Sequence, residues 1–262
     1  MKIRVLGCHG SDQLINRPFG TLSCRTCGFL VNDAVLVDAG TIGSQLLLCE
    51  QQRIQSILLT HLHFDHIKEL PTLADNLVGK TRAPVQVASI PEVLTGLETH
   101  IFNDAVFPNF FRIPNASQPV FQPRVLAAGH MSLLNGLEVT PIAVNHLVPT
   151  VGFVISDGDS CFLYSGDTYQ TDALWDVASR LPSLKAAFIE TSFPNDMAEL
   201  AAQTKHLTPL LLAEELRKLN RSEVPVYIYH MKPRFREKIV SELKQLDEWN
   251  ISVLEEGQEI YL

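Results

Sequence analysis

Features that would place the protein in a membrane, a secreted scaffold or a nucleic-acid complex are missing from the sequence. No apolar run approaches the ~18 residues that a membrane-spanning helix needs. The first residues, MKIRVLGCHG, alternate like a strand and lack the long apolar core of a signal peptide. No run of Lys and Arg stands out, and the formal net charge is −8. We therefore expect a cytoplasmic protein with no membrane partner, and nucleic acid is not the expected partner.

Cysteine usage argues against a disulfide framework, because the chain has five cysteines and this number is odd. Cys24 and Cys27 have the spacing of zinc ligands, yet no second CxxC follows them. A lone CxxC is weak evidence for a metal site or a redox site. Whether these two cysteines do anything stays open.

Apolar runs alternate with helical patterns along the 262 residues, and no linker or low-complexity segment divides them. The patterns predict strands at 3–7, 28–31, 34–40, 56–60, 83–89, 136–146, 150–156, 160–167, 185–190 and 224–230. They predict helices at 43–54, 67–77, 91–102, 172–181, 208–220 and 236–250, and a final hairpin at 251–262. The order indicates one α/β domain over 1–262, with two sheets packed together and helices outside. An irregular Phe/Pro-rich excursion at about 100–124 interrupts the pattern.

The stretch LLTHLHFDHIKEL, residues 58–70, holds three of the nine histidines of the chain. At this chain's own residue frequencies the pattern HxHxDH arises by chance in about one such chain in two thousand. In an extended segment, residues two apart point the same way, so His61 and His63 can bind one ion. Asp65 and His66 come after the chain turns and can face a neighbouring ion. The pattern predicts a metal site.

Three further polar residues lie where predicted strands end, namely His146, Asp167 and His230. Strand ends of an α/β scaffold are rigid, and the loops that leave them can direct ligands to a common point. Each residue alone has an ordinary interpretation, as a core histidine or a turn aspartate. Together with the histidine cluster they indicate one site.

With these residues the sequence resembles the metallo-β-lactamase superfamily, from VLVDAG through HxHxDH to His230. The resemblance implies an αββα sandwich of two mixed β-sheets with outer helices and a two-metal site. It implies that one ion is bound by His61, His63 and His146, that the other is bound by Asp65, His66 and His230, and that Asp167 bridges them. Imidazole and carboxylate ligands suit two divalent ions, zinc first, with manganese or iron as alternatives.

Two further residues indicate which type of reaction the protein catalyses. Glu190 in FIETSFPND ends a predicted strand, and His206 in KHLTP follows sixteen residues later. The pair resembles one that marks phosphodiesterases of this superfamily, including ribonuclease Z. The sequence segments IETSFPN, KHLTP, VYIYHMKP and HIFNDAVFPNF are most similar to those of class II 3′,5′-cyclic-nucleotide phosphodiesterases. That family commonly has a glycine where this chain has Glu69, which affects the local helix entry but no ligand.

The family resemblance implies hydrolysis of cAMP or cGMP to a 5′-nucleoside monophosphate. Asp65 would orient the attacking hydroxide, and His206, held by Glu190, would protonate the leaving 3′-oxygen. The stretch at 100–124 would lie near the site mouth, where its phenylalanines could stack on a purine or pack as a lid. Two alternatives stay open: a ribonuclease Z-like enzyme acting on RNA, and a non-catalytic metal-binding sensor. The base preference, the native metal and the oligomeric state, including a homodimer, are undecided by the sequence.

Overall fold

The computed structural model describes residues 1–17 and 20–262 and contains two mixed seven-stranded sheets. The first sheet has the order β16-β1-β4-β5-β6-β7-β8. Its strands are β1 (Lys2–Gly7), β4 (Gly28–Val31), β5 (Val35–Val37), β6 (Ser56–Leu58), β7 (Val85–Ser89), β8 (Phe121–Val125) and β16 (Glu259–Tyr261). Strands β5 to β8 are parallel to one another, and β4, β1 and β16 follow antiparallel.

The second sheet has the order β15-β14-β13-β12-β11-β10-β9. Its strands are β9 (Ser132–Leu134), β10 (Leu137–Ala143), β11 (Val151–Ser156), β12 (Cys161–Tyr164), β13 (Leu184–Glu190), β14 (Val226–Tyr229) and β15 (Ile251–Val253). Strands β12, β13 and β14 are parallel, and β10 runs in the same direction because two antiparallel steps separate it from β12. The carboxyl ends of these four strands therefore meet at one edge of the sheet.

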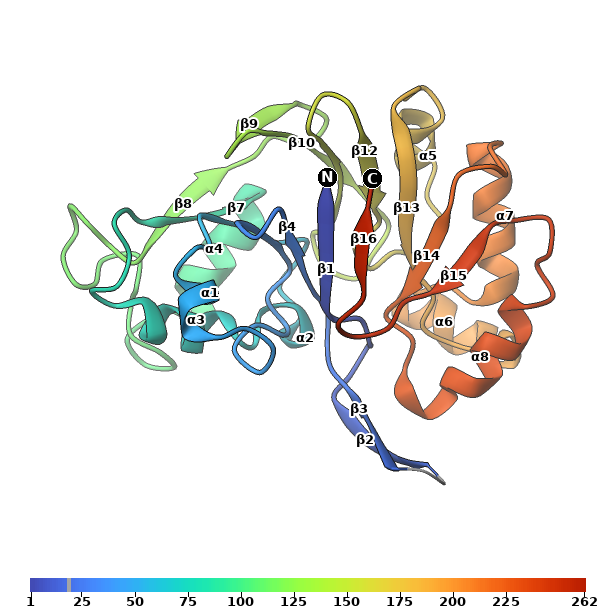
Figure 1. Cartoon of the computed structure of the whole chain (residues 1–262), viewed down its shortest axis with the longest axis horizontal. Helices are drawn as coiled ribbons and strands as arrows, with labels where there is room; N and C mark the ends of the chain where they lie inside the picture. Colours follow the sequence, from blue (N-terminus) through green and yellow to red (C-terminus); the bar gives the residue numbers. More distant parts are fainter. Residues whose placement is uncertain (18–19) are drawn as a thin grey trace.

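Helices cover the outer side of each sheet, which confirms the predicted αββα sandwich (Figure 1). Beside the first sheet lie α1 (Leu48–Gln51), α2 (Phe64–Ile67), α3 (Leu70–Leu77) and α4 (Pro91–His100). Beside the second lie α5 (Ala173–Ala178), α6 (Ala198–Thr204), α7 (Pro209–Leu219) and α8 (Arg236–Leu243). None of the helices in the described ranges has the length and apolar composition that crossing a bilayer requires.

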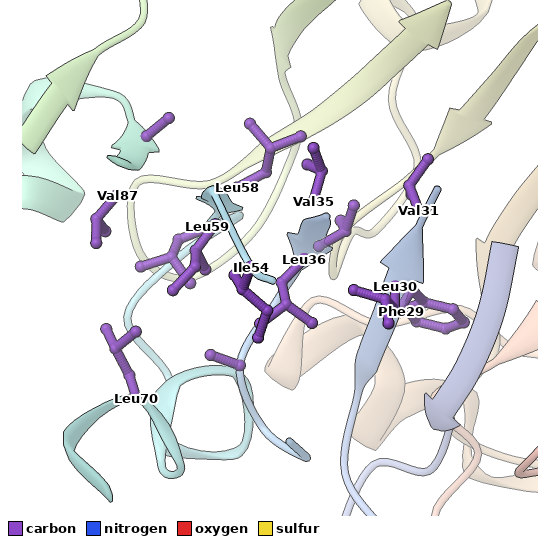
Figure 2. Close-up of a cluster of buried hydrophobic side chains, with 14 of the residues drawn as sticks. Phe29, Leu30, Val31, Val35, Leu36, Ile54, Leu58, Leu59, Leu70 and Val87 are labelled. Atoms are coloured by element: carbon purple, nitrogen blue, oxygen red, sulfur yellow. The ribbon is translucent and has the colours of Figure 1, made fainter. Parts of the chain in front are cut away.

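Apolar residues on both faces of the central strands explain why the sheets pack as layers. Strands β4 and β5 are buried along their whole length, and Figure 2 shows Val35 and Leu36 pointing to opposite sides of β5. One side faces the other sheet, where Phe29 meets Tyr164 and Tyr229 edge-on at ring-centroid distances of 5.3 and 5.6 Å. The other side faces the helices. Continuous apolar runs are what strands covered on both faces require.

Several predicted elements are wrong in their extent or pairing. Residues 251–262 form no hairpin, because β15 joins the second sheet beside β14 while β16 pairs with β1 in the first. The helix predicted at 43–54 is reduced to α1, since the Glu69 carboxylate accepts hydrogen bonds from the backbone N–H groups of Ile42 and Gly43 and holds that segment as a loop. The last predicted helix ends at Leu243.

Other elements have no sequence prediction behind them. A two-stranded ribbon, β2 (Gln13–Arg17) with β3 (Gly20–Cys24), extends away from the sandwich (Figure 1). Strand β9 and helix α6 are also unpredicted. In the irregular stretch, Phe102 is fully buried and contacts the rings of Phe111 and Phe121 at centroid distances of 5.4 and 5.8 Å. This stretch therefore contributes core packing, and its last residues enter β8.

Gly40 can be used to test how closely the first sheet packs against the segment that carries the histidine motif. A Cβ at this position would overlap the backbone oxygen of Asp65 and lie 2.7 Å from that of Cys27. We expect Gly40→Ala to lower the free energy of unfolding by roughly 1–3 kcal/mol, because backbone atoms have to move. Gly43→Ala is the control, since its Cβ would meet no atom nearer than 3.7 Å. Equal stability of the two variants in urea denaturation would contradict the expectation.

Candidate metal centre and acid–base pair

The structure brings all of the predicted site residues together. Most of them follow or end strands of the two sheets: His61 and His63 follow β6, His146 follows β10, Asp167 follows β12, Glu190 ends β13 and His230 follows β14. The other three lie in or between helices: Asp65 and His66 in α2, and His206 between α6 and α7. Strands β10, β12, β13 and β14 of the second sheet end at one edge because they run in one direction. Topology therefore gathers residues that are far apart in the sequence.

The first group of candidate ligands consists of His61, His63, His146 and Asp167, whose ligand atoms all lie within 4.8 Å of one another. His146 Nε2 lies 3.1 Å from His63 Nδ1, and His61 Nε2 lies 3.7 Å from Asp167 Oδ2. His61 and Asp167 are buried, and the other two are partly exposed. This set matches the first predicted metal position.

The second group is built around His66 and His230, whose Nε2 atoms lie 3.2 Å apart. Asp65 Oδ2 lies 3.4 Å from His230 Nε2. Asp167 Oδ2 lies 3.3 Å from the Nε2 atoms of both histidines, so this one carboxylate faces both groups. That position is the one the sequence resemblance predicts for a bridging ligand.

A buried carboxylate that was not among the predicted site residues orients two of the histidines. Asp38 follows β5 and accepts hydrogen bonds from His66 Nδ1 at 2.8 Å, from Thr60 Oγ1 at 2.9 Å and from Tyr164 Oη at 2.9 Å. Because Thr60 Oγ1 donates its only hydrogen to Asp38, it accepts one from His61 Nδ1 at 2.9 Å. Both imidazoles therefore direct Nε2 towards the cluster.

Glu190 is a second buried carboxylate that orients histidines, and it does so from the side of the second sheet. Its Oε1 accepts a hydrogen bond from His206 Nδ1 at 2.8 Å, and its Oε2 accepts one from Ser192 Oγ at 3.0 Å. Ser192 Oγ in turn accepts one from His230 Nδ1 at 2.8 Å. Glu190 thus fixes the predicted acid His206 directly and the candidate ligand His230 through Ser192, all of them buried.

The residues present fit a pair of metal ions. His61 Nε2 and Asp167 Oδ1 are buried and have no hydrogen-bond partner among the described residues. A buried polar atom without a partner is costly, and convergent lone pairs suit a cation. The 3.2 Å between His66 Nε2 and His230 Nε2 is close to the about 3.3 Å that separates two nitrogens bound to one tetrahedral zinc ion.

The electrostatics of the cluster also favour a cation. Burial lowers the pKa of His61 well below its usual range and lowers the pKa of His146 to about 4, so both imidazoles are neutral at physiological pH. Burial opposes protonation of His66, but the Asp167 and Asp38 carboxylates outweigh it and raise the pKa of this imidazole. The Asp167 carboxylate thus favours positive charge at the centre of the cluster, against the effect of burial.

Sequence reasoning missed Asp38, Thr60 and Ser192, although each lies in a quoted motif. Asp38 adopts φ = +58°, a left-handed conformation that is uncommon outside glycine and that marks a special position. In the CRTC motif, Cys27 Sγ lies within 4.8 Å of ligand atoms of His66 and His230. Burial first, and then the carboxylates of Asp167 and Asp38, raise the pKa of Cys27, so its side chain is a neutral thiol. None of the five cysteines forms a disulfide.

A family model described as a beta-lactamase superfamily domain matches residues 33–231, a range that contains every residue of the cluster. The chain belongs to this superfamily. The match confirms the resemblance to the metallo-β-lactamase superfamily that the motifs indicate. The metal ligands and the acid pair stay predictions that the geometry supports.

Curated relatives carry two different activities in their names. A ribonuclease Z from Mycobacterium sp. (strain KMS) is 26% identical over 184 residues, which cover 66% of this chain and 63% of that protein. A 3′,5′-cyclic-nucleotide phosphodiesterase from Schizosaccharomyces pombe is 27% identical over 96 residues, which cover 37% of this chain and 26% of that protein. The chain thus spans less than two thirds of the length of these relatives.

Among solved structures, unliganded yeast PDE1 superposes on this superfamily member with a TM-score of 0.81 and 20% sequence identity. The superposition covers 100% of this chain and 99% of that chain. At this identity the similarity shows a shared fold.

Metal content tests the shared position of Asp167. We expect elemental analysis of the purified protein to give close to two transition-metal ions per chain, and Asp167→Ala to retain clearly fewer, because one carboxylate faces both groups of ligands. Asp172→Ala is a suitable control, since Asp172 is an exposed aspartate at the start of α5. An Asp167→Ala protein that is folded and holds two ions would refute the bridging position.

Proposed function

We propose that the protein is a dinuclear-metal phosphodiesterase that hydrolyses 3′,5′-cyclic nucleotides to 5′-nucleoside monophosphates. The observation that carries this proposal is the Glu190–His206 pair, which adjoins a paired histidine cluster centred on one carboxylate. A ring nitrogen of His206 lies within 4.8 Å of ligand atoms of Asp167 and His230. A proton donor at that distance can serve a leaving group on a phosphate held in the cluster.

The two groups of candidate ligands would hold the ions: His61, His63 and His146 the first, and Asp65, His66 and His230 the second, with Asp167 between them. When bound, a pair of divalent ions lowers the pKa of a coordinated water and neutralises charge on phosphate oxygens. Zinc is the first choice for this donor set, and manganese and iron are the alternatives.

Two charged side chains at the second group of ligands can position the reactants. Asp65 is partly exposed and its pKa is held below its usual range: burial opposes ionisation, but His230 and His66 outweigh it. It is therefore a carboxylate that can accept a hydrogen bond from the attacking water and fix its direction. Lys232 Nζ lies 3.9 Å from Asp65 Oδ2 and donates to the Gly10 carbonyl at 2.6 Å. This ammonium can bind a phosphate oxygen beside the attacking water.

His206 can protonate the 3′-oxygen as the P–O bond breaks. Its Nδ1 hydrogen is engaged by Glu190, which leaves Nε2 to carry the proton that is transferred. Burial lowers the pKa of this imidazole, but the charge and hydrogen bond of Glu190 outweigh burial, and the net shift is upward. A raised pKa favours the protonated form of His206, as general acid catalysis requires.

Charge supports cyclic nucleotides over RNA as the substrate. The chain has 29 acidic and 21 basic side chains, whereas a protein that binds an RNA backbone needs a basic track. The second candidate function, cleavage of RNA in the manner of ribonuclease Z, is favoured by the longer alignment with the relatives that carry that name. Both candidates use the same cluster and the same acid pair.

The leaving group separates acid catalysis from metal chemistry. A ribose 3′-hydroxyl leaves poorly without a proton, whereas p-nitrophenolate leaves well without one. We expect His206→Ala to reduce kcat for cyclic AMP by roughly 10²-fold or more and to reduce hydrolysis of bis(p-nitrophenyl) phosphate far less. Steady-state kinetics at equal metal occupancy measure both losses.

Glu190→Gln should show the same direction more mildly, because Glu190 orients the imidazole and stabilises its protonated form. His130→Ala is the control, since this histidine is exposed on the connection between β8 and β9. Equal losses of His206→Ala on both substrates would assign His206 to phosphate binding in place of proton donation.

A direct comparison of substrates tests the ranking of the two candidate functions. On the same metal-loaded protein, we expect kcat/KM for cyclic AMP or cyclic GMP to exceed that for the 3′ processing of a precursor tRNA by at least about 10²-fold, because tRNA binding depends on many phosphate contacts. Gel electrophoresis of labelled precursor and chromatography of the nucleotides provide the two rates. Efficient trimming of the tRNA at its 3′ end would reverse the ranking.

A further inference from the structure

A groove of about 600 Å³ opens beside the candidate metal centre. It lies between the start of α4, the segment that follows β8 and the loop that follows β10. Its walls are apolar and include Ile90, Leu126, Ala128, Leu147 and Val148. Leu126 is fully buried and forms part of the floor, whereas Leu147 is 57% exposed at the rim.

The groove borders the metal centre at His146. This residue lines the groove, and its Nε2 lies 3.1 Å from His63 Nδ1 in the cluster. Its Nδ1 donates to the Lys205 carbonyl, which fixes the ring in this position. A molecule whose phosphate reaches the cluster can therefore place its neighbouring group in the groove.

The lining has little charge, and its one charged side chain is acidic. Glu92, in the first turn of α4, lines the groove, and no Lys or Arg is among the described residues that do so. Such a surface disfavours a second phosphate group. It suits an uncharged group with apolar faces and hydrogen-bond donors at its edge, which a carboxylate can accept.

The phenylalanines of the irregular stretch do not provide this surface. Phe102, Phe110 and Phe121 are buried and pack against one another, and no phenylalanine among the described residues lines the groove. The groove is therefore a surface for a base that is separate from these phenylalanines, and stacking of a purine on them stays a prediction.

We propose that this groove binds the base of the nucleotide, with Glu92 accepting a hydrogen bond from an exocyclic amino group. The inference rests on the proposed function and adds a substrate class to it: nucleotides with one phosphate whose base carries an amino group. Ala128, Leu147 and Val148 would contact the faces of the base, and Leu126 would support them from below. Glu92 would favour adenine over unsubstituted purine, which has no amino group.

Filling the groove tests the proposal without touching the metal cluster. Ala128 is exposed, so Ala128→Phe adds volume at the groove wall and leaves the core unchanged. Ala116→Phe is the matched control, because Ala116 is an exposed alanine outside the groove. Calorimetry on metal-loaded protein compares the binding of 5′-AMP with that of ribose 5-phosphate, which lacks the base.

We expect 5′-AMP to bind about tenfold or more tightly than ribose 5-phosphate to the wild type and to Ala116→Phe, since burial of the base contributes free energy. In Ala128→Phe the ratio should fall towards one, with binding of ribose 5-phosphate unchanged. Glu92→Ala should remove the preference for 5′-AMP over purine riboside 5′-monophosphate, and Glu98→Ala, a change on the same helix outside the groove, should keep it.

A ratio that Ala128→Phe leaves unaltered would overturn the assignment of the groove. So would an equal loss for both ligands, and so would tighter binding of octyl phosphate than of 5′-AMP, which would indicate an acyl chain as the occupant. Turnover of cyclic AMP by the wild type is measured in parallel. Absence of turnover refutes the proposed function, whereas turnover with an unaltered binding ratio refutes the groove assignment alone.

Discussion

The buried carboxylate of Asp38 is the constraint on which the rest of the site depends. An unpaired charge in the interior is very costly, so this carboxylate requires donors on every side. It receives them from the backbone and hydroxyl of Thr60, from His66 and from Tyr164. Thr60 precedes the histidine motif and Tyr164 belongs to the second sheet. Satisfying one charge therefore aligns the two sheets and turns two imidazoles towards the same space.

Glu190 repeats this arrangement from the second sheet, with Ser192 and His206 as its donors. Two buried anions thus orient imidazoles from opposite sides, and Asp167 lies where the two sets converge. Without a cation, the converging lone pairs repel one another and the buried carboxylates lack a balancing positive charge. Burial of either is then costly. A cation at their centre would offset both costs, so metal binding at this cluster would be coupled to folding.

The sequence predicted which residues converge in the fold, because metal chemistry restricts residue type and a pattern as dense as HxHxDH seldom arises by chance. The layers were also predictable, since strands covered on both sides need continuous apolar runs. Asp38 could not be recognised, because an aspartate at a strand end looks the same whether it caps a turn or supports a histidine. The hairpin expected at 251–262 was wrong for a related reason. A turn signal shows that a chain reverses, but it does not show which strands pair. Here β15 pairs with a strand of the second sheet and β16 with a strand of the first.

The pairing of β16 with β1 brings residues 259–261 beside residues 2–4 (Figure 1). During synthesis, β1 leaves the ribosome long before β16, so one border of the first sheet stays open while the segment between them is made. An open strand border can pair with another chain. The nascent protein is thus exposed to misassembly until β16 arrives, and the length of this exposure depends on how fast the intervening segment is made.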